Sequence, residues 1–194
     1  MAEQMTRFIL ASASPRRAHI FETLGLDFET VRTDVDETPL EGEAPSQLVL
    51  RVARAKVAEA APRFSSGLVV GADTIVVIDG RPLGKPADAD EAREMLRMLS
   101  GRWHAVMTGL VVRDVAGARE LAEHDKTLVR FRELSDEEID AYVETGEPLD
   151  KAGGYAIQGR AMLFVDEIAG NYQNVVGLPV TLLQRMVRRL GSDV

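Results

Sequence analysis

The chain alternates between two spacings of apolar residues, which predict helices and strands in turn. Apolar residues recur at helical spacing over 18–24, 46–61 and 183–190, and each of these segments is expected to bury one face against a core. A further helix is expected after Asp88, which has Glu91 three residues later, the spacing of a capping box.

The segments between the helices predict strands joined by turns. The expected strands are continuous apolar or β-branched runs: 8–11, 67–71, 75–78, 103–115, 118–132 and 162–168. Asp79-Gly80 is a strong tight-turn signal, and Ser135 with Glu138 predicts the capping box of a short helix. Thr33–Pro45 is acidic, contains two prolines and predicts a loop. Strands and helices mixed in this order predict an α/β or α+β fold around a mixed β-sheet.

Composition limits the class of protein. The 194 residues are 45% hydrophobic, enough for the core of one domain, and include no cysteine, which excludes disulfides and thiolate metal sites. The net charge of −8 argues against a broad nucleic-acid-binding surface, so an anionic ligand must be attracted by a local group of Lys and Arg or by a bound cation. No apolar run approaches the roughly 20 residues that cross a bilayer, and residues 1–7 lack a signal-peptide core. A soluble cytoplasmic protein without a membrane partner is therefore expected.

The most informative local motif is Ser12-Ala13-Ser14-Pro15-Arg16-Arg17, which lies between a predicted strand and a predicted helix. Ser14 is a favourable N-cap residue, and Pro15 suits the first turn of a helix. Backbone N–H groups at a helix start, two hydroxyls and two guanidiniums together suit a phosphate group. The same residues also fit an ordinary capped helix with two solvated arginines.

Two charged residues interrupt otherwise apolar surroundings. Asp73 lies in an apolar run, where a carboxylate is costly unless it is paired, hydrogen-bonded or bound to a cation. It suits a general base, a metal ligand or a structural aspartate bonded to backbone. Lys56 shares a helix face with small apolar residues, so its ammonium either points inward toward an anion or snorkels at the surface. Arg51 and Arg54 on the same helix are expected to be solvated.

Three further groups carry candidate chemistry. Lys85 follows Gly84 in a constrained turn and can hold a phosphate as a point charge, although most such lysines are simply exposed. Asp36 and Glu37 offer oxygen ligands suited to magnesium, in what is otherwise a plain acidic loop. The Gln158 amide both donates and accepts, which suits a nucleobase edge, in what is otherwise a glycine-rich connector.

In their order along the chain, these segments resemble the Maf family of nucleoside triphosphate pyrophosphatases. The matching pieces span almost the whole chain: 10–17, Val35-Asp36-Glu37, Arg54-Ala55-Lys56, Gly71-Ala72-Asp73-Thr74, Gly84-Lys85-Pro86, Leu99-Ser100-Gly101, Asp150-Lys151-Ala152-Gly153, Ile157-Gln158-Gly159 and Val176-Gly177-Leu178-Pro179. Each piece is unspecific alone, but the ordered set is highly specific. The resemblance implies a single domain over residues 1–194, folded as two lobes around an elongated mixed sheet with flanking helices. It also implies an active-site cleft between the lobes and a homodimer.

The resemblance further implies a reaction. It is hydrolysis between the α- and β-phosphates of a nucleoside triphosphate, which yields a monophosphate and pyrophosphate and uses a divalent cation, Mg²⁺ or Mn²⁺. The resemblance makes Asp73 the proton acceptor and, together with Glu37, a metal ligand. It makes five residues the phosphate ligands: Ser12, Arg16, Arg17, Lys56 and Lys85.

Two branches of the family differ in substrate, one resembling dTTP/UTP pyrophosphatases and the other 7-methyl-GTP pyrophosphatases. The pyrimidine branch carries Arg, Thr and Gln at three positions, and Arg16, Thr74 and Gln158 match all three. The segment Val35-Asp36-Glu37-Thr38-Pro39 looks more like the methyl-guanine branch. The match implies a hydrolase for dTTP and UTP, extending to modified pyrimidine nucleotides, whose Thr74 and Gln158 contact the substrate. A 7-methyl-GTP pyrophosphatase and a nucleotide-binding regulator of cell division stay open as alternatives.

Overall fold

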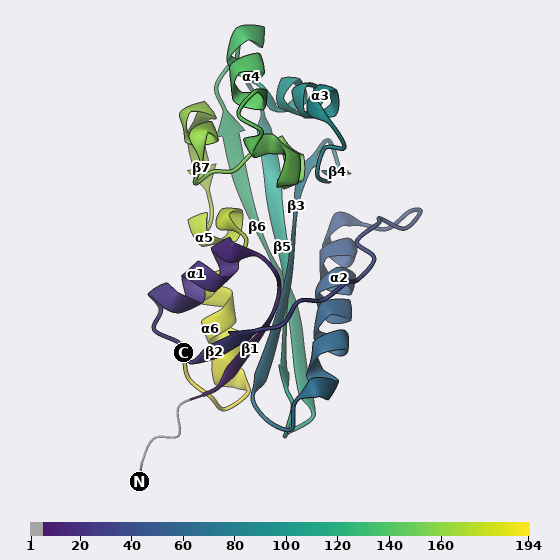
Figure 1. The fold of residues 1–194 in the computed structure, drawn as a ribbon, viewed down its shortest axis with the longest axis vertical. Helices are drawn as coiled ribbons and strands as arrows, with labels where there is room; N and C mark the ends of the chain where they lie inside the picture. Colours follow the sequence, from purple (N-terminus) through teal and green to yellow (C-terminus); the bar gives the residue numbers. More distant parts are fainter. Residues whose placement is uncertain (1–5) are drawn as a thin grey trace. The chain divides into compact units, whose positions relative to one another are not determined.

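The computed structural model describes residues 6–194 and has a mixed α/β fold (Figure 1). The strands are β1 (Phe8–Ala11), β2 (Phe28–Thr30), β3 (Leu68–Ile78), β4 (Arg81–Leu83), β5 (Trp103–Asp114), β6 (Arg119–Phe131) and β7 (Val165–Ala169). The α-helices are α1 (Pro15–Thr23), α2 (Pro45–Ala60), α3 (Ala89–Leu99), α4 (Asp136–Val143), α5 (Tyr172–Val176) and α6 (Val180–Arg189). Short 3-10 turns occupy η1 (Ala61–Arg63), η2 (Glu147–Asp150), η3 (Ala152–Gly154) and η4 (Arg160–Phe164). The predicted fold class is confirmed.

The seven strands of the described region form one mixed sheet. Their order is β2-β1-β3-β5-β6-β7, and β4 pairs with β3 off this path. The β1 strand runs parallel to both of its neighbours, with Phe8 opposite Phe28 and Leu68. The pairs β3–β4 and β6–β7 are antiparallel, and the predicted turn Asp79-Gly80 joins β3 to β4 with positive φ angles of 50° and 77°. Parallel and antiparallel pairs together make the sheet mixed, as the sequence predicts.

The chain divides into two compact units, which are described separately. Unit 1 comprises Met1–Asp73, Thr108–Asp125 and Gly177–Val194, and unit 2 comprises Thr74–Met107 and Lys126–Val176. The long strands β3, β5 and β6 each contribute residues to both units. The single two-lobed domain with a cleft between its lobes stays a prediction from the sequence.

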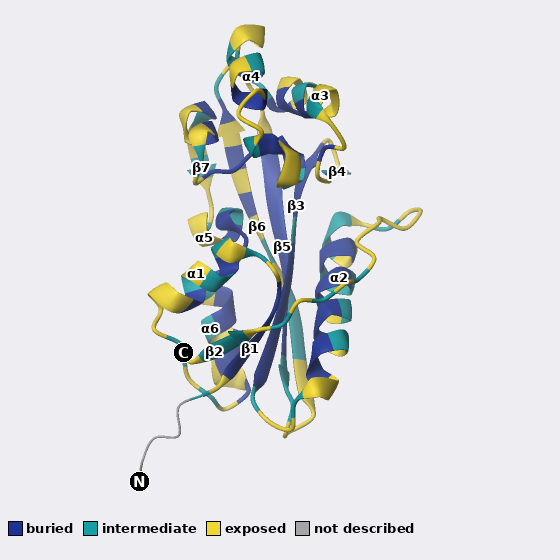
Figure 2. Cartoon of the chain, viewed as in Figure 1, coloured by how far each residue is buried: buried dark blue, intermediate teal, exposed yellow. Residues whose placement is uncertain are grey.

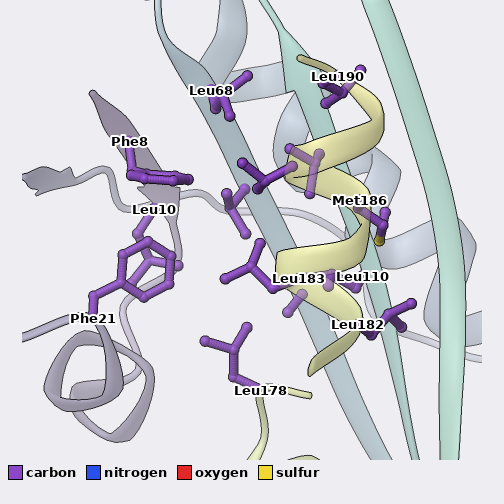
Figure 3. Packing of buried hydrophobic residues seen from close by; sticks show 14 residues of the cluster. Phe8, Leu10, Phe21, Leu68, Leu110, Leu178, Leu182, Leu183, Met186 and Leu190 are labelled. Carbon is purple, nitrogen blue, oxygen red and sulfur yellow. The ribbon is translucent and has the colours of Figure 1, made fainter. Parts of the chain in front are cut away.

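Unit 1 has a core on each face of its strands. Because successive strand residues point to opposite faces, Phe8 and Leu10 enter one core and Ile9 and Ala11 enter the other. Figure 3 shows the first core, where Phe8 and Leu10 of β1 point toward side chains of α6 such as Leu183. The second core contains the apolar face of α2, whose buried residues appear as a dark stripe along that helix in Figure 2.

Two glycines let α2 lie close against the strands. A Cβ atom at Gly109 would come 2.3 Å from the Val49 carbonyl oxygen, and one at Gly71 would come 2.7 Å from the Ala53 carbonyl oxygen. Neither position has room for a larger side chain without moving backbone. The same helix carries Lys56.

Unit 2 combines helix pairs linked by charge with an aromatic core. Arg93 of α3 donates to Asp140 of α4 at 2.6 Å, and Arg97 donates to Asp136 at 2.7 Å. The core includes edge-to-face ring pairs that join His104, Phe131, Tyr155, Phe164 and Tyr142. These contacts give unit 2 a core of its own, separate from the two cores of unit 1.

Several sequence predictions change in detail. The expected strand pieces 67–71 and 75–78 form one continuous strand, β3, because Asp73 and Thr74 stay in extended conformation. Ser14 occupies the N-cap position of α1, but its side chain makes no capping hydrogen bond. The last strand begins at Val165 rather than Met162, since the 3-10 turn η4 takes up the preceding residues.

The capping box expected at α3 forms only in part. The Asp88 carboxylate accepts from the Glu91 N–H at 2.9 Å, as predicted, but the Glu91 carboxylate accepts from Ala87 rather than from Asp88. At α4 both bonds of the predicted box are present, between Ser135 and Glu138. No helix within residues 6–194 is both long and apolar enough to span a bilayer.

Candidate active site

Unit 1 gathers a charged cluster around the ammonium of Lys56. Lys56 Nζ lies 2.9 Å from Asp73 Oδ1 and 2.7 Å from Glu37 Oε1. It also donates to the Ala72 carbonyl oxygen at 3.4 Å. The structure therefore brings together three predicted site residues that lie far apart in the sequence. Of the two orientations that the sequence left open for Lys56, the structure has the inward one.

Two of these three residues are buried. Lys56 is 7% exposed and Asp73 is 7% exposed, whereas the Glu37 side chain is about half exposed at 48%. Removing a charged group from water costs several kcal/mol unless a partner compensates for it. Lys56 and Asp73 compensate for each other, which explains how an aspartate can occupy the middle of an otherwise apolar strand.

Ser12 and Arg17 form a second buried group at the start of α1. Arg17 donates through Nη1 to Ser12 Oγ at 3.2 Å and through Nε to the Gly177 carbonyl oxygen at 2.8 Å. Ser12 Oγ also accepts from the Ser14 N–H at 3.2 Å, so Ser12 rather than Ser14 organises this helix start. Both Ser12 and Arg17 are less than a tenth exposed.

Electrostatics link the two groups of unit 1. Burial lowers the pKa of the Arg17 guanidinium, while the nearby charge of Asp73 opposes that shift. Arg16 lowers the same pKa as a neighbouring like charge, and Glu37 raises it. Five of the charged candidates from the first part of the chain therefore act on a common region, and three of the five are positive: Arg16, Arg17, Lys56, Glu37 and Asp73.

The loop that carries Glu37 is held by Arg51, a residue that sequence reasoning placed in solvent. Arg51 donates to the two Glu43 carboxylate oxygens at 2.7 and 2.9 Å and to the Thr38 carbonyl oxygen at 2.9 Å. The hydrogen bond to Glu43 raises the pKa of Arg51, and the same bond lowers the pKa of Glu43. Arg51 is only partly solvated, with 32% of its side chain exposed, because it ties α2 to the loop beside Glu37.

Asp36 takes a different role from its neighbour. Its Oδ1 accepts from the Thr38 N–H at 2.9 Å, and hydrogen bonding by Thr38 lowers the pKa of Asp36. Asp36 thus closes a turn of the loop, and it is Glu37 that reaches Lys56.

Unit 2 carries the other predicted substrate residues, and it holds them differently. Thr74 is partly buried within β3, whereas Lys85 and Gln158 are exposed on turns. The Gly153 N–H donates to the Gly84 carbonyl oxygen at 2.9 Å, which joins the turn before Lys85 to the glycine-rich segment before Gln158. The described hydrogen bonds and ion pairs do not join Lys85 directly to Gln158.

The donor set of unit 1 fits a divalent cation of the magnesium type. Residues 6–194 hold no cluster of three or more His, Cys, Asp or Glu side chains that would cage a metal. Magnesium in nucleotide sites uses one or two carboxylates together with water and substrate phosphates. Glu37 and Asp73 supply two carboxylates on one ammonium, which matches that requirement.

Comparison with known proteins places the chain in a family. The family model described as "Maf-like protein" matches residues 7–190. The chain is 47% identical to the "dTTP/UTP pyrophosphatase" of Desulforamulus reducens over 98% of its length and all of that protein, and 48% identical to a protein of the same name from Symbiobacterium thermophilum over 98% of this chain and 97% of that one. The Staphylococcus aureus Ham1 protein has a similar fold, with a TM-score of 0.55 at 13% identity, over 95% of this chain and 99% of that chain. The chain belongs to the Maf-like protein family.

Proposed function

We propose that this protein is a nucleoside triphosphate pyrophosphatase that hydrolyses dTTP and UTP to the monophosphate and pyrophosphate. Its full-length relatives carry the name dTTP/UTP pyrophosphatase, at identities of 45–48%. The observation that carries the proposal is the pairing of the buried Lys56 ammonium with the carboxylates of Asp73 and Glu37. Arg16 and Arg17 add positive charge in the same region, and an excess of basic groups suits a polyanionic substrate.

Phosphate binding is assigned to the basic residues of unit 1 and to Lys85. Arg17 and Ser12 are already fixed by hydrogen bonds, so they can meet a phosphate oxygen with little loss of side-chain entropy. Arg16 adds a guanidinium at the same helix start, and Lys85 of unit 2 adds an exposed ammonium. These groups would stabilise the negative charge that develops on the departing pyrophosphate.

Asp73 is assigned as the proton acceptor. Its carboxylate is buried and its Oδ1 is held by Lys56 at 2.9 Å, which fixes the direction of the group. In the proposed step, Asp73 takes a proton from the water that attacks the α-phosphorus, and the bond to the β-phosphate oxygen breaks. Positioned general bases of this kind contribute about 10²–10⁴-fold to rate.

A divalent cation, Mg²⁺ or Mn²⁺, is proposed as the cofactor, with Glu37 and Asp73 as its protein ligands. Bound there, it would supply charge neutralisation for the phosphate oxygens. Lys56 contacts both carboxylates and so keeps them together when the cation is absent. The partly exposed Glu37 can turn toward a cation with less rearrangement than the buried Asp73.

Base recognition is assigned to Gln158, with Thr74 and Arg16 as further substrate contacts. The Gln158 amide offers one donor and one acceptor, which complement the carbonyl and N–H of a uracil or thymine edge. A methyl group in an apolar pocket discriminates by only about 1–3 kcal/mol, which is consistent with acceptance of both dTTP and UTP.

The test is pyrophosphate release by purified protein over a panel of dTTP, UTP, CTP, ATP, GTP and 7-methyl-GTP, with Mg²⁺ or Mn²⁺. The proposal expects dTTP and UTP to have the highest kcat/KM. Preference for 7-methyl-GTP would support the other family branch, and binding without pyrophosphate release would support a regulator. Protein carrying Asp73→Asn, prepared in parallel, controls for a contaminating pyrophosphatase.

A cytoplasmic homodimer without nucleic-acid or membrane partners completes the proposal. The net charge of −8 supports the expectation that nucleic acid is not a ligand. Sedimentation at several protein concentrations tests the dimer, and fractionation of cells that express the chain tests the compartment.

A further inference from the structure

The turn that presents Gln158 is fastened at both ends. It runs from Ala156 to Arg160 and is closed by a hydrogen bond from the Gly159 N–H to the Ala156 carbonyl oxygen at 2.9 Å. The Gln158 side chain is exposed, so its position depends on the backbone that carries it. What holds this backbone therefore decides where the amide can reach.

Two side chains from outside the turn bind its backbone. Glu147 Oε2 accepts from the Arg160 N–H at 3.2 Å, and Tyr142 Oη accepts from the Ala156 N–H at 3.3 Å. Tyr142 Oη in turn donates to Glu147 Oε1 at 2.9 Å. The hydroxyl and the carboxylate thus form one bridge that spans the turn on either side of Gln158.

Gly159 shows how tightly the bridge fits. A Cβ atom on this residue would come 1.9 Å from Glu147 Oε1, well inside any allowed contact. The turn can lie against the carboxylate only because residue 159 lacks a side chain. The glycine of Ile157-Gln158-Gly159 therefore has a defined task, which is to admit Glu147.

Tyr142 is a rigid anchor for the bridge. It is 3% exposed on α4, and its ring packs edge-to-face on Phe164 at 5.1 Å between centroids. Burial and the neighbouring Glu147 raise the pKa of the Tyr142 hydroxyl, so the group stays protonated and donates to the carboxylate. A protonated hydroxyl can accept from Ala156 and donate to Glu147 at the same time.

We propose that Tyr142 and Glu147 are positioning residues that set nucleobase selectivity by holding the Ala156–Arg160 turn in the conformation that presents the Gln158 amide to the base. This inference rests on the proposed function, in which Gln158 reads a pyrimidine. Neither residue touches the substrate. Both act through the backbone of the turn, and the phosphate and proton-transfer groups of unit 1 are untouched by their loss.

Discrimination between UTP and CTP is the measurement most sensitive to loss of this bridge. Uracil presents an acceptor and an N–H donor, whereas cytosine presents an amino donor and a ring acceptor. A glutamine amide matches either pattern after a half-turn, so selectivity requires that the amide approach the base from one fixed position. A loosened turn is expected to admit both bases.

The experiment compares Tyr142→Phe and Glu147→Gln with wild type, using steady-state hydrolysis of UTP and CTP. Tyr142→Phe removes the acceptor for Ala156, and Glu147→Gln removes one of the two carboxylate oxygens. We expect the ratio of kcat/KM for UTP over CTP to fall about tenfold, through a higher KM for UTP at nearly constant kcat. Equal losses of kcat with both nucleotides, at an unchanged ratio, would overturn the proposal.

Matched controls carry the same chemical changes on exposed residues of the same unit. Tyr172→Phe and Glu144→Gln alter an exposed tyrosine and an exposed glutamate and are expected to leave the ratio unchanged. Hydrogen–deuterium exchange of the unliganded proteins gives a second readout. The N–H groups of Ala156 and Arg160 should exchange faster in Tyr142→Phe and Glu147→Gln than in wild type or in the two control variants. Unchanged exchange at both N–H groups would overturn the proposal without reference to the substrate.

Gln158→Ala separates this proposal from the function on which it rests. If Gln158→Ala lowers the UTP/CTP ratio of kcat/KM but Tyr142→Phe and Glu147→Gln do not, Gln158 recognises the base and the positioning role of the bridge is wrong. If Gln158→Ala leaves the ratio unchanged, the base-reading role fails and the selectivity proposal fails with it. If Tyr142→Phe does not fold, Glu147→Gln still decides the outcome, since its carboxamide replaces the carboxylate at nearly constant volume.

Discussion

The two units hold their polar side chains in opposite ways. Among the described residues, the buried charged side chains Arg17, Lys56 and Asp73 all belong to unit 1. Unit 2 buries neutral polar groups instead, such as His104, whose Nε2 lies 2.8 Å from the Tyr155 hydroxyl. Unit 1 therefore maintains charge away from water, while unit 2 avoids burying it.

The difference agrees with the chemistry proposed for unit 1. Buried charges are a costly way to stabilise a fold, since an apolar substitute of similar volume is often as stable. Their concentration in unit 1 is explained if they meet a charged ligand and a transferred proton. In unit 2 the candidate residues Lys85 and Gln158 are exposed, and side chains from outside the Gln158 turn bind its backbone.

The largest expected effect comes from removing the carboxylate at the centre of unit 1. Asp73→Asn should lower kcat for dTTP by about 10²–10⁴-fold, because the amide cannot take a proton from water. Nucleotide affinity should change far less, since the basic residues remain. Pyrophosphate release and equilibrium binding of dTTP measure the two quantities. Asp166→Asn, the same change at an exposed position of β7, serves as the control. Normal turnover by Asp73→Asn would remove Asp73 as the base.

The two candidate lysines test the contrast through stability. Lys56→Met leaves the buried Asp73 without its ammonium and should lower the free energy of unfolding by about 3 kcal/mol. Lys85→Met alters an exposed turn and should change it by less than about 0.5 kcal/mol. Urea denaturation gives both values. Adding Asp73→Asn to Lys56→Met should recover part of the loss, and a purely additive double variant would show that the two residues are not coupled.

Local patterns allowed much of this arrangement to be predicted from the sequence. The helix face of Lys56 left two orientations open, inward and snorkelling, whereas the Ser135–Glu138 box and the Asp79-Gly80 turn are encoded within a few residues. In the box and the turn the partners are neighbours in sequence, so spacing determines geometry. The sequence also indicates that Asp73 has a charged or hydrogen-bonding partner, because a carboxylate in an apolar strand requires one.

Contacts between distant segments could not be predicted in this way. Arg51 has the same local surroundings as a solvated helix residue, and its partners Glu43 and Thr38 are set by the path of an irregular loop. The bridge of Tyr142 and Glu147 to the Gln158 turn likewise depends on how 3-10 turns follow α4. Side-chain to backbone bonds of this kind leave no periodic signal in a sequence.

Because unit 2 buries His104 in its neutral form, the free energy of unfolding should depend on pH. Burial lowers the pKa of His104 from 6.5 to about 4. Between these pH values the His104 side chain binds a proton in the unfolded chain but not in the folded chain. The contribution of His104 to the free energy of unfolding is therefore complete above pH 6.5 and is lost as the pH falls toward 4. The loss should reach about 3 kcal/mol near pH 4.

Replacement of His104 isolates this contribution. His104→Gln keeps a hydrogen-bonding group near Tyr155 but cannot titrate, so the unfolding free energy should fall less steeply from pH 6.5 to 4 than in wild type. His19→Gln, at an exposed helix position, should leave the wild-type slope unchanged. Equal slopes for His104→Gln and wild type would mean that unit 2 tolerates a buried charge after all.

The smallest effect compares two serines at helix starts, one from each unit. Ser135 accepts from the Glu138 N–H at 3.3 Å in a complete capping box, and Ser135→Ala should lower the free energy of unfolding by about 1 kcal/mol. Ser14 holds the same position on α1 but makes no capping bond, so Ser14→Ala should cost no more than a few tenths of a kcal/mol. A chemical denaturation series on both variants tests this ordering. Equal losses would mean that the Ser14 hydroxyl stabilises α1 in solution, and the start of α1 would then be an ordinary capped helix rather than one kept open for a ligand.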